Sequence, residues 1–85
     1  MYRIEKVVAV DGSSAAVDVQ VAYRPFLIQN AEASDAIYFK EKNGVAATAD
    51  NGFAVAAGAT LETVLTADVL SVYGGKANIL LLEVG

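Results

Sequence analysis

The 85-residue chain contains no cysteine, no histidine and no tryptophan, and it has a single proline. Without cysteine there is no disulfide, zinc–thiolate centre, iron–sulfur cluster or thiol nucleophile. Without histidine the chain lacks the usual general base near pH 7 and the commonest transition-metal ligand. Ser–His–Asp and Cys–His catalysis and histidine-ligated metals are therefore excluded, and we expect a protein that is not an enzyme and holds no cofactor or metal.

Positive charge is also scarce, because six basic residues stand against ten acidic ones and the formal net charge is −4. A nucleic-acid-binding surface clusters lysine and arginine to neutralise phosphates, whereas here the basic residues are scattered. The nearest approach to a cluster, Lys40-Glu41-Lys42, is interrupted by an acid. We therefore expect no direct binding of nucleic acid.

Long hydrophobic runs are missing too, although the mean hydropathy is +0.45. The longest uncharged stretch, residues 51–61, falls short of the about 20 apolar residues of a membrane-spanning helix. Arg3, Glu5 and Lys6 interrupt the N-terminus, which does not fit a signal peptide. We expect no membrane association, synthesis in the cytoplasm and, at this length, a single domain over residues 1–85.

What the chain does contain is alternation with a period of two, which is typical of half-buried strands. In residues 15–24 four side chains share one face: Val17, Val19, Val21 and Tyr23. In residues 2–10 one face carries four others, with Lys6 as the exception: Tyr2, Ile4, Val8 and Val10. Asp11-Gly12 lies between the two segments and predicts a tight turn with a positive φ. The first two strands are therefore predicted to form a hairpin.

Turn signals divide the rest of the chain into further short strands, predicted at residues 26–29, 35–42, 45–48, 53–56, 60–65, 69–73 and 76–84. Pro25 separates residues 26–29 from the preceding strand of residues 15–24, at a sheet edge or a crossing between sheets. Asn43-Gly44 and Gly74-Gly75 each predict a hairpin, and residues 59–64 also have some helix propensity. Seven to nine short strands indicate an all-β fold, either an antiparallel β-sandwich or a jelly-roll-like barrel.

The last predicted strand differs from the others because residues 79–82, Ile-Leu-Leu-Leu, are apolar on both faces. Strands of this kind are typical of the centre of a sheet that is covered on both sides. We therefore expect this strand to lie centrally, with a covering layer on each face.

Alanine is abundant, with 16 residues, and many of them lie between residues 46 and 59. Alanine is disfavoured in strands and buries little area, so an alanine-rich core would stabilise a small domain weakly. We expect an oligomer or a lattice partner to supply stability. The alternative is that small residues let the two sheets pack closely.

The polar motifs favour turns rather than sites. Asp50-Asn51-Gly52 resembles a fragment of a calcium loop, but no second acid follows before Glu62, whereas Ca²⁺ takes six to eight oxygen ligands. The serines of residues 11–14 have no base to activate them. Single, scattered acids do not form the carboxylate pair of a glycoside hydrolase.

Four segments follow one another as an apolar strand ending in asparagine, a short hairpin, a turn with an apolar stretch ending in glycine, and a final glycine-hinged hairpin. They are residues 24–30 (RPFLIQN), 36–39 (AIYF), 48–58 (TADNGFAVAAG) and 72–82 (VYGGKANILLL). This order resembles that of small β-sandwich virion proteins of tailed bacteriophages, which include head decoration or cement proteins and fibre or spike domains. The resemblance covers about residues 24–85 and carries over no functional residue.

The resemblance implies a non-enzymatic virion structural protein, a capsid decoration or cement protein on the outer surface of the major capsid shell. Its partner would be the major capsid protein or another virion protein, and the chain would be a homo-oligomer or lattice-bound. The alternative is a carbohydrate- or receptor-binding module of a head or tail fibre or spike. A solvent-exposed coplanar pair of tyrosines would favour that alternative, and the candidates are Tyr2, Tyr23, Tyr38 and Tyr73.

For the protein interface the N-terminal segment Tyr2, Arg3 and Ile4 is the first candidate, because chain ends often pair with a neighbour's sheet edge. Arg24 and Phe26, which flank Pro25, are the second candidates. The alternative places Tyr2 and Ile4 in the chain's own core.

Overall fold

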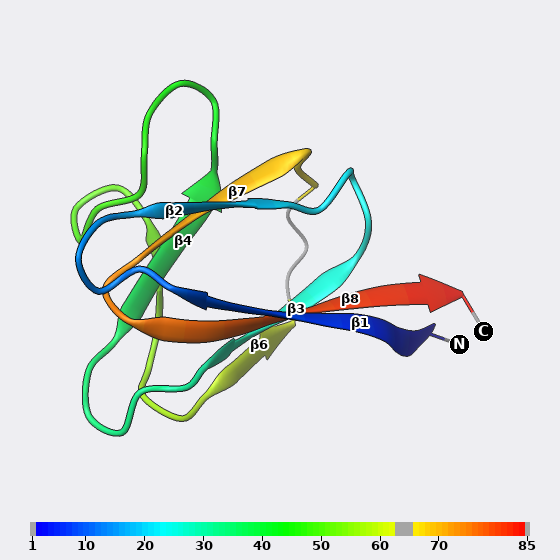
Figure 1. Cartoon of the computed structure of the whole chain (residues 1–85), viewed down its shortest axis with the longest axis horizontal. Coiled ribbons are helices and arrows are strands. Elements are labelled where there is room, and N and C mark those ends of the chain that lie inside the picture. The colour runs from blue at the N-terminus through cyan, green and yellow to red at the C-terminus, as the bar shows by residue number, and fades with distance from the viewer. Residues whose placement is uncertain (1, 63–65, 85) are drawn as a thin grey trace.

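The computed structural model describes residues 2–62 and 66–84, and these contain eight strands and no helix. The strands are β1 (Tyr2–Asp11), β2 (Val17–Gln20), β3 (Phe26–Asn30), β4 (Ile37–Glu41), β5 (Phe53–Val55), β6 (Thr60–Glu62), β7 (Val69–Tyr73) and β8 (Lys76–Val84). They form two antiparallel sheets (Figure 1): sheet A, in the order β1-β8-β3-β6, and sheet B, in the order β2-β7-β4-β5. The predicted all-β sandwich is confirmed.

Consecutive strands alternate between the sheets except for β4 and β5, which pair with each other, so that β1, β3, β6 and β8 lie in one layer and β2, β4, β5 and β7 in the other. This strand order is that of the eight-stranded jelly roll, which is built from two Greek keys. Within the described ranges no helix is long and apolar enough to cross a membrane.

Two predicted hairpins are wrong, because β1 and β2 lie in different sheets and so do β7 and β8. The β1–β2 and β7–β8 connections instead cross from one sheet to the other, and these two crossings lie against each other. The Gly12 N–H donates to the Gly75 carbonyl at 2.8 Å, and the Gly74 N–H donates to the Gly12 carbonyl at 3.0 Å. Gly12 does not have the predicted positive φ; a Cβ there would lie 2.5 Å from the carbonyl oxygen of Val72. Glycine is needed at this position for close approach of two backbones.

The segment predicted as a strand over residues 45–48 belongs to a loop. The chain leaves β4 at Glu41 and returns as β5 at Phe53, which pairs with Phe39 across the same sheet. Within this loop Ala47 is buried and its N–H donates to the Ser71 hydroxyl at 2.8 Å. The loop therefore lies against sheet B instead of adding a strand to it. The strand predicted from residue 60 is confirmed to residue 62, and its remainder, residues 63–65, lies outside the described residues.

The core lies between the sheets and consists mainly of large aliphatic and aromatic side chains, with Ala67 and Ala77 as its alanines. Phe26 of sheet A and Phe39 of sheet B meet edge to face, with ring centroids 6.4 Å apart. The alanines between residues 46 and 59 are mostly exposed: Ala46, Ala49, Ala54, Ala56 and Ala57. The prediction of an alanine-rich core is wrong, and alanine gives no argument for a stabilising partner.

Asn30, which ends β3, is buried, and its side chain connects three parts of the backbone by hydrogen bonds. The side-chain amide of Asn30 donates to the carbonyls of Asp35 at 2.8 Å and Val55 at 2.9 Å, and its oxygen accepts the Glu32 N–H at 2.7 Å. A buried amide must be paired in this way to offset its desolvation. Asn30 thus fixes the connection from β3 to β4 and ties it to β5.

Candidate functional site

The outer faces of the two sheets differ in character. On sheet B, Ser71 points away from the core but is fully buried, because the loop between β4 and β5 covers it. Beside it the outer face is polar: Lys42 pairs with Asp18 at 3.0 Å. On the outside of sheet B, the chain's own loop therefore covers Ser71, and charged side chains face the solvent beside it.

On the outside of sheet A, Glu62, Gln29 and Asn78 are polar, but the part that extends towards the chain ends is apolar and uncovered, and we call this part the open face. It consists of Tyr2, Ile4 and Val7 of β1, Leu27 of β3, and Leu80, Leu82 and Val84 of β8. Directly opposed residues share a face, and the register sets Val7, Leu80 and Leu27 side by side across three strands. Tyr2, Ile4, Val7 and Val84 have exposed fractions of 58%, 52%, 54% and 75%.

An irregularity in β1 decides which side chains reach the open face. The pairing with β8 runs Ile4–Leu82 and then Lys6–Leu81, so that Glu5 is an extra residue, as in a β-bulge. The bulge shifts the alternation by one residue. Val8 and Val10 therefore pack against the core, as predicted, whereas Tyr2 and Ile4 turn outward.

The predicted common face of these four side chains is therefore wrong. The alternative that Tyr2 and Ile4 fill the core is wrong as well, since both are more than half exposed. Lys6 was the only exception in the predicted pattern, and it lies immediately after the bulge.

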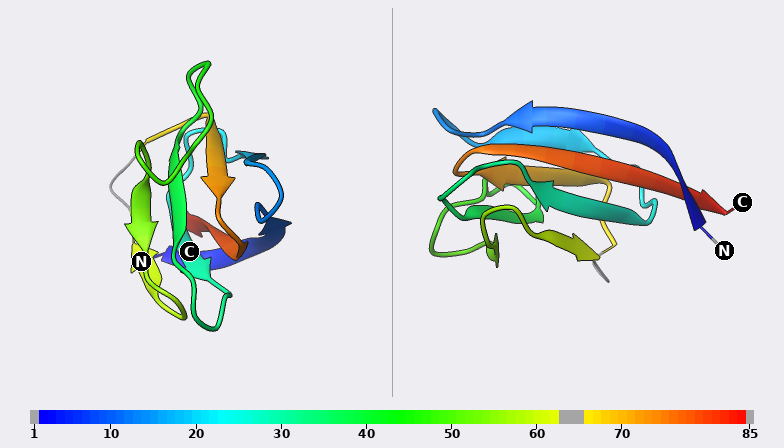
Figure 2. Two further views of the ribbon diagram at one scale, coloured as in Figure 1. Left: turned by 90° about the vertical axis from the view of Figure 1, so that its left-hand side faces the viewer. Right: turned by 90° about the horizontal axis from the view of Figure 1, so that it is seen from below.

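The chain ends form a ribbon that projects from the sandwich (Figures 1 and 2). Strand β3 begins at Phe26, opposite Leu81, so β8 continues beyond it with β1 as its partner strand. Arg3 and Glu83 form an ion pair across the ribbon at 2.6 Å. An isolated two-stranded ribbon is marginally stable in water.

Arg24 braces the base of this ribbon. Its guanidinium forms an ion pair with Glu5 and donates to the Leu82 carbonyl at 3.3 Å. The end of the molecule that bears the ribbon carries three basic side chains, Arg3, Lys6 and Arg24, and four acidic ones: Glu5, Glu83, Glu62, which lies opposite Leu27, and Asp68, whose carbonyl binds the turn before Arg24. Acidic and basic side chains are therefore mixed at this end, and it has no net positive charge.

The structure brings most of the predicted interface residues together. Tyr2, Arg3 and Ile4 lie in the ribbon and Arg24 lies at its base. Phe26 is 1% exposed, so its side chain is not accessible to a partner; it starts β3 on the inner side of sheet A.

Sequence reasoning missed the other members of the open face: Val7, Leu27, Leu80, Leu82 and Val84. The signal was present in residues 79–82, whose apolar character on both faces predicted a strand covered on both sides. The core covers Ile79 and Leu81, while Leu80 and Leu82 are on the uncovered side.

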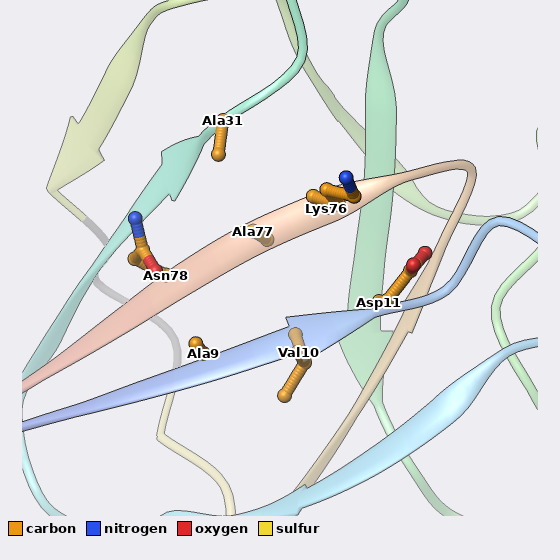
Figure 3. A pocket seen from close by; sticks show the side chains of 7 residues that line it. All are labelled: Ala9, Val10, Asp11, Ala31, Lys76, Ala77 and Asn78. Carbon is orange, nitrogen blue, oxygen red and sulfur yellow. The ribbon is translucent and has the colours of Figure 1, made fainter.

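A shallow depression of about 350 Å³ lies beyond the apolar part of sheet A (Figure 3). It is lined by Ala9, Val10, Asp11, Ala31, Lys76, Ala77 and Asn78. Hydrogen bonds from the hydroxyl and then the N–H of Ser13 lower the pKa of the Asp11 carboxyl, and Lys76 adds to the effect. The Asn78 amide is already bonded to Gln29 at 3.0 Å. One carboxylate and one ammonium over small apolar residues provide no catalytic arrangement.

The other predicted motifs behave as turns. The Asn51 side chain accepts the Thr48 N–H at 2.7 Å, which closes the turn at residues 48–52. In the part of the chain that the structure describes, no group of three or more acidic side chains could hold a metal ion.

The tyrosines do not form the stacked platform that would favour a carbohydrate site. Tyr38 lies opposite Tyr73 on the outside of sheet B, and both are half-buried. Among residues 2–62 and 66–84 the close aromatic pairs are Phe26–Phe39 and Phe39–Phe53. A scan against protein-family models and searches of the curated proteins and of the solved structures find no match to this chain.

Proposed function

We propose that the chain is a non-enzymatic structural protein of a tailed-phage virion, which decorates the outer surface of the capsid by docking its open face on the major capsid protein. The observation that carries the proposal is the uncovered apolar surface on the outside of sheet A. The outside of sheet B, in contrast, has a loop over Ser71 and charged side chains beside it. A large exposed apolar patch typically marks a protein interface. Aliphatic side chains suit a protein surface better than a sugar, which is usually stacked on aromatic rings.

The segment order of residues 24–82 and the jelly-roll strand order, which is common in viral capsid proteins, support the virion context.

The size of the open face limits the affinity that it can provide alone. Sheet A is four strands wide and its longest strand has 10 residues, so its outer face covers at most about 600 Å². Stable complexes bury about 800 Å² on each partner. A second contact beside the open face would therefore strengthen the docking.

The experiment is to purify particles of a phage that encodes this chain, identify their proteins by mass spectrometry and locate the chain by cryo-electron microscopy. The proposal expects the chain in mature particles, as density on the outer capsid surface that contacts the major capsid protein through sheet A. Absence from mature particles would overturn it. Density confined to a tail fibre or spike would support the receptor-binding alternative.

A further inference from the structure

The turn between β2 and β3 contains two consecutive non-glycine residues in the left-handed backbone region. Ala22 has φ = 51° and Tyr23 has φ = 62°. The Arg24 N–H donates to the Val21 carbonyl at 3.0 Å, which closes a four-residue turn around them. Positive φ at both central residues is the pattern of a type I′ turn, which favours Asn-Gly because a Cβ is strained there.

The chain uses glycine elsewhere for this conformation. The other described residues with positive φ are Gly44, Gly58 and Gly74. A glycine at position 22 or 23 would satisfy the same turn without strain, so folding alone does not account for a tyrosine. Residues held in such conformations concentrate at functional sites, where the surrounding structure fixes them.

The surrounding structure fixes this turn firmly. The N–H groups of Val21 and Ala22 both donate to the Asp68 carbonyl, at 2.8 and 2.9 Å, and the Tyr23 N–H donates to Ala67 at 2.7 Å. Val21 is buried beneath the turn. Three hydrogen bonds thus tie the backbone of the turn to residues 67–68 while it carries a strained tyrosine.

The ring of Tyr23 buries little area and so contributes little to the stability of the fold. Tyr23 is 65% exposed, the largest exposed fraction among the described aromatic residues. Its hydroxyl forms no hydrogen bond within residues 2–62 and 66–84. The next residues join the turn to the ribbon: Arg24 contacts Glu5, and the Pro25 carbonyl accepts the Leu82 N–H at 3.0 Å. Tyr23 therefore immediately precedes the brace at the base of the ribbon and lies at the ribbon end of the molecule.

We infer that Tyr23 is the anchor residue of the docking surface, held outward by a strained turn so that its ring enters an apolar pocket of the capsid protein. This inference rests on the proposed function and adds the second contact that the small open face requires. Tyrosine is among the residues that dominate binding energy at protein interfaces, because it buries a large rigid ring with few rotatable bonds. The strain in the free chain means that replacement by glycine should stabilise the fold and weaken the docking.

The test compares two glycine variants of the same turn, Tyr23→Gly and Ala22→Gly, with the wild-type chain. The binding probe is the capsid purified from a phage deleted for this chain, and affinity is measured by co-sedimentation. The thermal midpoint of each free variant is measured by calorimetry. Each variant places glycine at a position with positive φ and so removes the backbone strain there. Both should therefore unfold at a temperature equal to or about 4 °C above that of the wild type.

The expected result is that Tyr23→Gly binds capsids roughly 10- to 100-fold more weakly, as for an interface anchor, while Ala22→Gly binds as the wild type does. Tyr23→Phe should lose less than Tyr23→Gly, since it keeps the ring. Equal binding by Tyr23→Gly and wild type overturns the inference and leaves the proposed function intact. So does a fall of the Tyr23→Gly midpoint, because the ring would then stabilise the fold. A wild-type chain that fails to bind the capsid overturns the proposed function, and the anchor with it.

Discussion

Single residues set how closely the two sheets approach at the end of the sandwich opposite the ribbon. Gly12 lies directly over the backbone of β7, and its N–H and carbonyl both bond to the neighbouring crossing. The sequence indicated glycine for a turn here, but the structural need is space for another backbone. An alanine at position 12 distinguishes the two requirements, because its methyl group would clash with the neighbouring backbone even though the φ of Gly12 suits any residue.

Gly12→Ala is expected to destabilise the fold by about 1–3 kcal/mol, because its Cβ would meet backbone atoms that cannot rotate away. Gly58→Ala is the matched control, since Gly58 has φ = 72° but open space around it. That control should lose only the strain of a left-handed alanine, about 1 kcal/mol. Urea denaturation measures both variants. If Gly12→Ala costs less than Gly58→Ala, the close approach at Gly12 does not limit the packing.

Ser13 determines the ionisation of Asp11, whose pKa lies below its ordinary value of 3.8. A carboxyl with a lowered pKa in the folded state stabilises the fold above its unfolded pKa and loses this contribution as the pH falls through the folded value. In Ser13→Ala the Asp11 pKa should rise towards 3.8, which a carboxyl NMR titration would measure. The stability difference between wild type and variant should then shrink as the pH falls below about 4. An unchanged Asp11 pKa would contradict the role of Ser13.

At the scale of elements, alternation predicted where most strands lie, and it could not predict which sheet each strand joins. Strands such as β2 and β3 are short alternating segments bounded by turn residues, which local sequence encodes. A glycine-rich turn looks the same in a hairpin and in a crossing between sheets. The partner of β1 is β8, 65 or more residues further along the chain, and no local signal identifies it.

The loop between β4 and β5 shows the same limit. Asn43-Gly44 predicted a two-residue hairpin, and Gly44 does have a positive φ. The residues that follow nevertheless leave the sheet and pack over Ser71, because the Ala47 N–H finds a side-chain hydroxyl instead of a strand partner. A long-range hydrogen bond of this kind leaves no pattern in the sequence.

Ser71→Ala should therefore loosen this loop without unfolding the sheet. Loss of the hydroxyl leaves the buried Ala47 N–H unpaired, which costs about 1–3 kcal/mol and should speed hydrogen exchange at Ala47. Gln20→Ala on the same outer face is the control, because its side chain is exposed and bonds to Asp68. Protection of Ala47 that is equal in wild type and Ser71→Ala would show that the loop is held by other contacts.

At the scale of the molecule, the chain is a sandwich in which a loop covers part of the outside of sheet B, while the apolar open face of sheet A is uncovered. Part of the open face is predictable: Tyr2 and Ile4 are candidates as chain-end residues, and residues 79–82 are apolar on both faces. The position of Val7 on this face is hidden by the bulge at Glu5, which reverses the alternation of β1 halfway along. Alternation predicts Tyr23 on a strand face, whereas it lies in a strained turn.

The most direct test of a docking role is to place charge on the open face and measure occupancy on the particle. In the double variant Val7→Lys and Leu80→Lys both new side chains point outward, so the fold should survive, as judged by its thermal midpoint. Ala54→Lys on the exposed outside of sheet B is the matched control. Capsids deleted for the chain are incubated with each protein, and bound copies are counted by mass spectrometry. We predict that the double variant is lost from capsids while wild type and Ala54→Lys remain. Equal occupancy by the folded double variant would contradict docking through sheet A.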